Sequence, residues 1–237
     1  MPRLLDDEPR ELVGALERRR TDLSGVEVLA GYGVMGQTFA SGHVLALRRF
    51  PVSSFGPGYT AVWHRDPEGQ WIVYGDVPME YGCARYLGCG PEMYVEAPIT
   101  IRWSGSRILT VGVGAARLAW TMRLQSSPAT RILDMLGRRV PESVWRADRA
   151  VSVMERGAGW LLRAGRVNLV GTMPGGYRFQ VQPHHLWLLS DAYATLDGEG
   201  LGTTGPLPVP GRLGELRIPQ RGIFATVTVR ISPERAA

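Results

Sequence analysis

Four side chains that could exchange protons with a substrate lie in or beside segments with the pattern of β-strands: His43, His64, Asp76 and Glu96. Histidine titrates near neutral pH, and a carboxylate in a strand is costly to bury unless it has a partner or a task. We therefore predict these four as catalytic residues of an acid–base site. The alternative is that the histidines lie on the surface or are hydrogen-bonded within the fold. The adjacent His184 and His185 would point to opposite faces of a strand, which argues against a joint metal site.

Large aromatic side chains and an arginine are the candidates for contacting a ligand. Tyrosine and tryptophan combine a broad apolar surface with a polar group, which suits the wall of a pocket. An inward arginine could hold a carboxylate or an enolate by two parallel hydrogen bonds, and Arg48, Arg102, Arg117 and Arg123 are possibilities. The predicted ligand-binding residues are Tyr59, Trp63, Tyr74, Trp103, Trp120, Arg123 and Tyr177. Core packing of the aromatic residues and outward solvation of the arginines are the alternatives.

The chain has no lysine, because all 27 basic residues are arginine. Schiff-base catalysis and a phosphate-loop lysine are therefore excluded, except through a terminal amino group. The run Gly31–Gly36 fits the G-x-G-x-x-G pattern of dinucleotide sites, but no amphipathic helix or alternating βαβ layout follows it. We predict that the protein uses no cofactor and no metal.

Composition and charge favour a globular protein with one core. Charged residues make up 21% of the chain and hydrophobic residues 44%, both close to globular averages. The net charge of +5 comes from arginines that are scattered along the chain, so we expect no nucleic-acid partner. No apolar stretch has the length of a membrane span and no leader segment is evident, which predicts a cytoplasmic protein. Cys83 and Cys89 lack zinc spacing and are too few for a disulfide framework, so we expect reduced thiols.

The register of two hairpins follows from their turn residues. Between Trp63 and Trp71, Pro67 and Gly69 fit a type I turn closed by a bulged glycine, which pairs Asp66 with Gln70. This register places Tyr59, Ala61, Trp63, Trp71 and Val73 on one face, and Thr60, Val62, His64, Ile72, Tyr74 and Asp76 on the other. The second hairpin turns at Pro174–Gly176 and has one apolar and one polar face, as in the wall of a barrel or sandwich.

The whole pattern predicts a single, mainly β domain over residues 1–237. Short strand-like runs punctuated by glycine and proline predict an antiparallel, closed or nearly closed barrel of about 10–12 strands. Residues 1–22 contain a predicted N-terminal helix, with acidic residues before it and arginines at its end. A helical insertion is predicted around 127–163, where Ser127 and Pro128 start a helix and Pro141 divides the segment.

Several turn segments resemble those of known families. The run Gly69–Trp71 and the segments Gly171–Phe179 and Leu196–Gly202 are similar to hairpins of lipocalin-like (calycin) β-barrel proteins of the carotenoid hydratase and tocopherol cyclase type. The segments Gly56–Tyr59 and Cys83–Gly88 resemble the acetoacetate decarboxylase-like barrels, whose chemistry uses a Schiff-base lysine that this chain lacks. Both resemblances imply a closed barrel around a small organic molecule.

Together these features predict a barrel that binds a small, largely apolar organic molecule. The protein would transform it without a cofactor by acid–base chemistry, as in cyclisation, hydration or isomerisation. One alternative is a non-catalytic carrier of the same kind of hydrophobic ligand. Another is an interaction module that docks through an arginine-rich helical face formed by Arg149, Arg156 and Arg163. The sequence does not distinguish a monomer from a homodimer.

Overall fold

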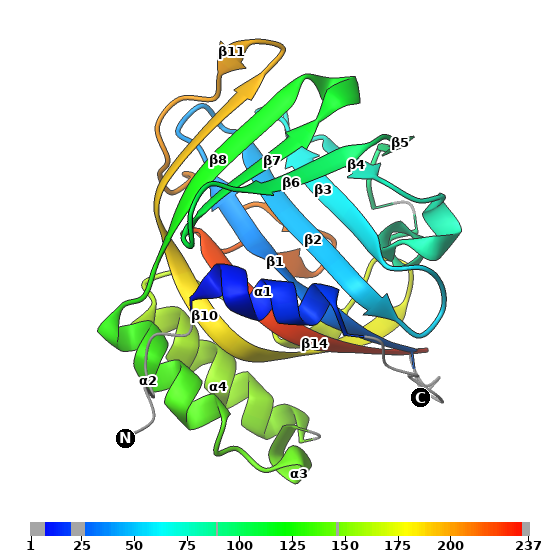
Figure 1. Cartoon of the computed structure of the whole chain (residues 1–237). Coiled ribbons are helices and arrows are strands. Elements are labelled where there is room, and N and C mark those ends of the chain that lie inside the picture. The colour runs from blue at the N-terminus through cyan, green and yellow to red at the C-terminus, as the bar shows by residue number, and fades with distance from the viewer. Residues whose placement is uncertain (1–7, 20–26, 89, 146, 234–237) are drawn as a thin grey trace.

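The structure is a computed structural model that describes residues 8–19, 27–88, 90–145 and 147–233 (Figure 1). Within these residues one 12-stranded mixed sheet dominates the fold, and its main path runs β5-β4-β3-β2-β1-β14-β10-β8-β7-β6. The two short strands β9 and β11 pair with β10 outside this path, and β12 and β13 form a separate ribbon. Cys89 lies outside the described residues, so its predicted state as a reduced thiol stays a prediction.

The strands of the main path are β1 (Glu27–Thr38), β2 (Val44–Ser53), β3 (Tyr59–Arg65), β4 (Trp71–Gly75), β5 (Met93–Glu96), β6 (Ile99–Trp103), β7 (Ile108–Val113), β8 (Leu118–Gln125), β10 (Tyr177–Leu196) and β14 (Ile223–Pro233). The other strands are β9 (Val170–Thr172), β11 (Glu199–Gly200), β12 (Arg212–Leu213) and β13 (Leu216–Arg217). The helices are α1 (Pro9–Glu17), α2 (Pro128–Gly137), α3 (Glu142–Trp145) and α4 (Asp148–Leu161), with short 3₁₀ turns η1 (Met79–Tyr81), η2 (Cys83–Tyr86) and η3 (Gly114–Ala116).

The sheet curls strongly into a half-barrel, so that β6, β7 and β8 pass in front of β1, β2 and β3 (Figure 1). The long strand β10 produces this curl, because its first part pairs with β14 and its last part pairs with β8. Within the described residues the end strands β5 and β6 do not pair, and α1 lies across the opening. The predicted fold class, a mainly β and nearly closed barrel with an N-terminal helix and a helical insertion, is confirmed.

One strand pair departs from the predicted antiparallel pattern, because β4 and β5 are parallel. A parallel pair needs a connection that carries the chain back to the end where the first strand began. Here the segment with η1 and η2 provides that crossover. The predicted N-terminal helix is also shorter than expected, since α1 ends at Glu17.

The interior of the curl is a packed core. Residues from β1 to β4 meet residues from β6, β7, β8, β10 and β14, and Val13 of α1 packs against them. Trp120, Phe224, Leu109 and Val111 have essentially no exposed surface, so large side chains occupy the centre. Filling of this kind is typical of small barrels, whose interior is only wide enough for side chains.

The outer face of the sheet is covered by two further layers. One cluster packs the far side of β1 to β4 against η2 and the segment around Leu207–Ile218. Another packs β10 and β14 against the helical insertion, with Val151 and Trp145 in its centre. Strands β2 and β3 are therefore covered on both faces, which explains why nearly every residue of β3 is buried.

The turn of the first hairpin and the start of α2 are formed by the residues that predicted them. In the first hairpin the Asp66 N–H donates to the Gln70 carbonyl at 3.1 Å, and Gly69 adopts φ +100°. Ser127 caps α2 by accepting from the Thr130 N–H at 3.1 Å, and Pro128 occupies the first turn. The two faces predicted for β3 and β4 fall in different clusters, one inside the curl and one outside it.

The glycine pattern at residues 31–36 belongs to a strand. Gly31 and Gly33 lie in β1, and a Cβ at either position would clash with a backbone carbonyl oxygen of β2. Glycine is therefore required for the close approach of two strands, not for a nucleotide. None of the helices among the described residues has the length and apolar character needed to cross a membrane.

Candidate functional site

An apolar cavity of about 120 Å³ lies on the outer face of the sheet, beneath the segments that cover it. Leu29, Phe50 and Val229 line it from the strands, and Met173 and Ile218 line it from the covering segments. An apolar cavity of roughly 150 Å³ is large enough to hold benzene. The volume therefore suits a compound of about six non-hydrogen atoms.

Arg48 of β2 places a guanidinium in the wall of this cavity. Its Nη1 donates to the carbonyl oxygens of Val34 at 2.5 Å and Leu47 at 2.9 Å, and its Nη2 donates to the carbonyl oxygen of Met35 at 3.3 Å. Val34 and Met35 lie where the register of β1 against β2 shifts, so Arg48 satisfies carbonyls at an irregular part of the ladder. The guanidinium carbon also lies 4.7 Å from the ring centre of Trp63.

These contacts hold the Arg48 side chain in a defined orientation and leave part of it free to bind. Arginine has five N–H donors in a planar fork, and three are used here. The remaining two are Nε–H and one Nη2–H. Donors on neighbouring nitrogens of a guanidinium can bind the two oxygens of a carboxylate.

No acidic side chain lines the cavity or pairs with Arg48 among the described residues. Burial lowers the pKa of Arg48, but a guanidinium still stays protonated at neutral pH. Arg49, the next residue, shows the contrast, because its Nε and Nη2 donate to both oxygens of Glu17 at 2.9 and 2.7 Å. A cation that is partly removed from water and has no counter-ion is costly, so the Arg48 site could accept an external anion.

Three of the polar side chains in the wall are Tyr59, Trp63 and Cys83. Burial raises the pKa of the Tyr59 hydroxyl well above its ordinary value and also raises that of the Cys83 thiol, so both keep their protons at neutral pH. Tyr59 Oη and Trp63 Nε1 have no oxygen or nitrogen partner in the described part of the chain. Both neighbour the Cys83 sulfur, which is a weak acceptor. The Tyr59 hydroxyl and the Trp63 indole N–H could therefore donate hydrogen bonds to a group in the cavity.

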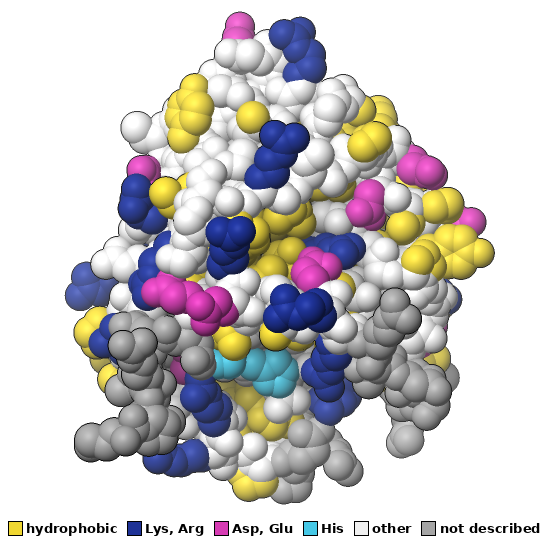
Figure 2. All heavy atoms as spheres, viewed as in Figure 1, with side chains coloured by type: hydrophobic (Ala, Val, Ile, Leu, Met, Phe, Trp, Pro, Cys, Tyr) yellow, Lys and Arg dark blue, Asp and Glu magenta, His cyan; other side chains and the backbone are white. Residues whose placement is uncertain are grey.

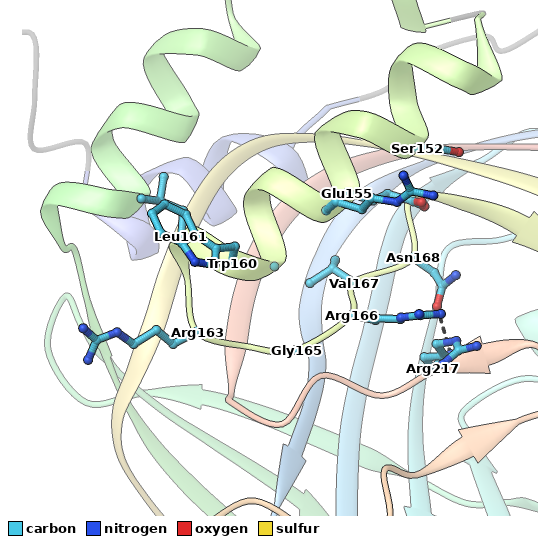
Figure 3. A pocket seen from close by; sticks show the side chains of 12 residues that line it. Ser152, Glu155, Trp160, Leu161, Arg163, Gly165, Arg166, Val167, Asn168 and Arg217 are labelled. Atoms are coloured by element: carbon cyan, nitrogen blue, oxygen red, sulfur yellow. Dashed lines mark hydrogen bonds between the residues drawn. The ribbon is translucent and has the colours of Figure 1, made fainter.

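A second, open pocket adjoins the cavity near α4 (Figure 3). Asn168 and Arg217 line both spaces, and the Arg217 backbone N–H donates to Asn168 Oδ1 at 3.1 Å. Two polar side chains therefore lie at the boundary between the two spaces.

The two predicted catalytic histidines lie together, but on the opposite face of β3 from the cavity. His43 Nδ1 and His64 Nε2 are 2.9 Å apart, and the two rings stack with their centres 5.2 Å apart. Burial and repulsion from His43 lower the pKa of His64 to about 4, while burial also lowers the pKa of His43. The pair is therefore neutral at physiological pH.

The two predicted catalytic carboxylates lie apart from these histidines. Asp76 is exposed, and its Oδ1 accepts from the Thr60 N–H at 2.6 Å. Glu96 is exposed at the end of β5. The structure therefore does not gather the four predicted acid–base residues at one point.

The predicted ligand-binding residues divide among three places. Tyr59 and Trp63 line the cavity. Tyr74 and Trp120 belong to the core inside the curl, and Trp103 packs against its edge. Tyr177 packs on the outer layer with its ring 5.1 Å from that of Tyr86, and Arg123 is exposed on β8.

A groove also opens beside α1, at the mouth of the curl. Asp76, Trp103, Tyr32 and Arg49 are among the residues that line it. Figure 2 shows hydrophobic side chains within a hollow on this face and charged side chains around it. One ion pair lies in the groove, where Glu17 accepts from Arg49 and also from the Tyr32 hydroxyl.

In the sequence Arg48 is only one of several arginines that could bind an anion, and nothing marks Cys83 as more than a reduced thiol. One feature of the sequence could have indicated Arg48. Adjacent residues in a strand point to opposite faces. Arg48 and Arg49 follow one another in a strand that is covered on both sides, so each needs an anionic or polar partner. Only Arg49 has a carboxylate partner among the described residues.

No protein-family model matches the chain, and no curated protein matches it either. Among solved structures, an acetoacetate decarboxylase from Legionella pneumophila subsp. pneumophila str. Philadelphia 1 is similar, with a TM-score of 0.41 and 12% sequence identity. The match covers 91% of this chain and 88% of that chain. It assigns no role to any residue, and the resemblance to lipocalin-like proteins stays a prediction.

Proposed function

We propose that the protein binds a small organic anion, with a carboxylate at Arg48 and a short apolar body in the cavity. The observation that carries this proposal is a half-buried guanidinium with two N–H donors unused and no carboxylate partner among the described residues. Leu29, Phe50 and Val229 would contact the apolar body. The ligand would gain charge-assisted hydrogen bonds in a dry environment, where they are stronger than in water.

Binding without turnover is the function that this geometry supports best. Acid–base catalysis at the ligand needs a proton acceptor, whereas Arg48, Tyr59 and Cys83 are all protonated at neutral pH. The His43–His64 pair lies on the other face of β3. The proposed role is therefore that of a carrier or sensor of a small monocarboxylate.

Isothermal titration calorimetry with short aliphatic monocarboxylates, each compared with its neutral amide, tests the proposal. We expect the acid to bind and the matching amide to bind at least about 10-fold more weakly, because a hydrogen bond to a charged group contributes about 1.5–3 kcal/mol. Arg48→Gln should weaken binding of the acid by a similar factor. The matched control Arg123→Gln removes the same charge from an exposed strand position and should bind like the wild type.

Arg48→Lys is the second variant, because glutamine leaves part of the irregular ladder without a donor. Lysine keeps the charge and can still donate to the backbone, but it cannot present two parallel N–H groups. We expect a folded protein with weakened binding. Equal binding of acid and amide, or unchanged affinity in both Arg48 variants, would overturn the proposal.

A further inference from the structure

The helices α2 and α4 cover the outer face of β10 and β14 with their inward sides. Leu133 of α2 and Val151, Met154 and Leu162 on and just after α4 pack in the same cluster as residues of these strands. A helix turns 100° per residue, so the residues on the far side from this cluster face solvent. Figure 1 shows both helices on the outside of the sheet, so their outward sides form one flank of the molecule.

The outward side of α4 combines arginines with large apolar residues. Val153 is 66% exposed and Trp160 is 82% exposed. Arg149 and Arg156 are also exposed. Arg149 precedes Val153 by four residues, and Arg156 lies three residues after Val153 and four before Trp160. These four residues form one stripe along the helix, since such spacings fall on the same helical face.

The outward side of α2 has the same mixture. Ile132, Met135 and Leu136 are 44%, 45% and 51% exposed. Arg131 and Arg139 are exposed beside them. An isolated exposed apolar residue needs no explanation, but a repeated pattern on two neighbouring helices marks an interaction surface.

The two acidic side chains that the structure describes in residues 128–163, Asp134 and Glu155, are not exposed on this flank. Glu155 turns its carboxylate to the chain itself, where Oε1 accepts from the N–H groups of Leu169 at 2.5 Å and Val170 at 2.9 Å. The flank therefore presents positive charge and apolar surface together.

We propose that this flank docks on a bilayer surface that contains anionic phospholipid. Arginine pairs with phosphate, and tryptophan is well suited to the boundary between head groups and acyl chains. A nucleic acid would use the arginines but leave Val153, Trp160 and the α2 side chains in water. An amphipathic surface that is basic and apolar at once is the pattern of interfacial helices.

The open pocket at the end of α4 provides a place for a phosphate group within this flank. Figure 3 shows Arg166 and Arg217 near each other at one end of the pocket, and Trp160 and Arg163 at the other. The guanidinium groups of Arg166 and Arg217 come from separate segments and suit a doubly coordinated anion. Glu155 also lines the pocket, and its Oε1 accepts from the Leu169 and Val170 N–H groups. The lipid head group would enter here while Trp160 contacts the acyl boundary.

Vesicle co-sedimentation of the full chain tests this proposal. We expect binding to vesicles of phosphatidylcholine that contain about 30% phosphatidylserine, and little binding to vesicles of pure phosphatidylcholine. Binding should fall as salt is raised, because surface charges are screened. The double variant Arg149→Gln/Arg156→Gln should reduce partitioning about 10-fold or more. Trp160→Ser should reduce partitioning at both low and high salt concentration, because it removes an apolar contact and not a charge.

Two matched controls separate this surface from general charge and stickiness. Arg102→Gln/Arg117→Gln removes two exposed arginines from the opposite part of the sheet, and Tyr193→Ser removes an exposed aromatic residue from β10. Both controls should partition like the wild type. Circular dichroism confirms that each variant is folded.

Several results would overturn the proposal. These are equal sedimentation with neutral and anionic vesicles, equal losses in the control and test variants, and binding to polyphosphate or RNA without binding to vesicles. Quenching of Trp160 fluorescence by brominated lipid, judged by comparison with Trp160→Phe, gives an independent readout. Absence of quenching in vesicle-bound protein would contradict the orientation.

Discussion

Lowering the pH from 7 to 5 should destabilise the protein through His64. This side chain is only 3% exposed, and its Nδ1 has no partner among the described residues. Its Nε2 faces the ring of His43, so an added proton would be buried next to a second imidazole. Burial and this neighbour lower the pKa of His64 from 6.5 to about 4 in the folded state.

The sign and size of the effect follow from proton linkage. In the unfolded chain His64 takes up a proton near pH 6.5, whereas the folded chain resists it until about pH 4. The stabilising contribution is therefore present above the unfolded pKa and is lost as the pH falls from 6.5 towards 4. For one site with these values, the loss between pH 7 and pH 5 is about 2 kcal/mol. A chain of this size should lose roughly 4–8 °C in Tm.

Differential scanning calorimetry of the wild type and two variants at pH 5, 6 and 7 measures this contribution. His64→Phe keeps a ring but cannot take up a proton, so its Tm should depend less on pH. His184→Gln changes an exposed histidine and should keep the wild-type slope. The reasoning fails if His64→Phe loses as much stability as the wild type, or if NMR shows His64 titrating near pH 6.5.

Three further predictions concern the frame of the fold. Trp120→Ala should lower the free energy of unfolding by about 3–5 kcal/mol in urea titrations, because it empties the centre of the curl; a loss below about 1 kcal/mol would contradict that packing. Ser127→Ala should cost about 1 kcal/mol by removing the α2 cap, whereas Ser127→Asp should restore it. Glu17→Gln should cost about 1 kcal/mol at pH 7. Burial raises the pKa of Glu17, but hydrogen bonds from Arg49 and Tyr32 outweigh it and hold that pKa below its ordinary value. The difference from wild type should therefore shrink as the pH falls below about 4.5 in the same titrations, and a constant difference would refute this role.

Much of the local structure could be predicted because its causes are local. Pro67 and Gly69 determine the turn and the pairing of Asp66 with Gln70, and alternation then assigns each neighbour to one of two faces. Ser127 and Pro128 start α2 for an equally local reason. The half-barrel followed from many short strands that need their edges paired or covered.

The site could be predicted only in part, because alternation says which residues share a face but not which face points inward. Tyr59 and Trp63 share a face with Ala61, and that face turned out to lie outside the curl. The predicted acid–base residue His64 points the other way for the same reason. Both faces of β3 are buried, so hydrophobicity could not distinguish them.

The sequence by itself determined the strand registers, the helix starts and the absence of lysine chemistry, since each depends on residue type and near neighbours. Only the tertiary structure decided that the centre of the curl is filled and that the cavity lies behind it. That cavity needs Met173 and Ile218 to close over β1 and β14, which are distant along the chain. The tertiary structure also decided that Arg49 pairs with Glu17, whereas Arg48 has no acidic partner in the described chain. Local sequence patterns do not predict ion pairs between residues that are distant along the chain.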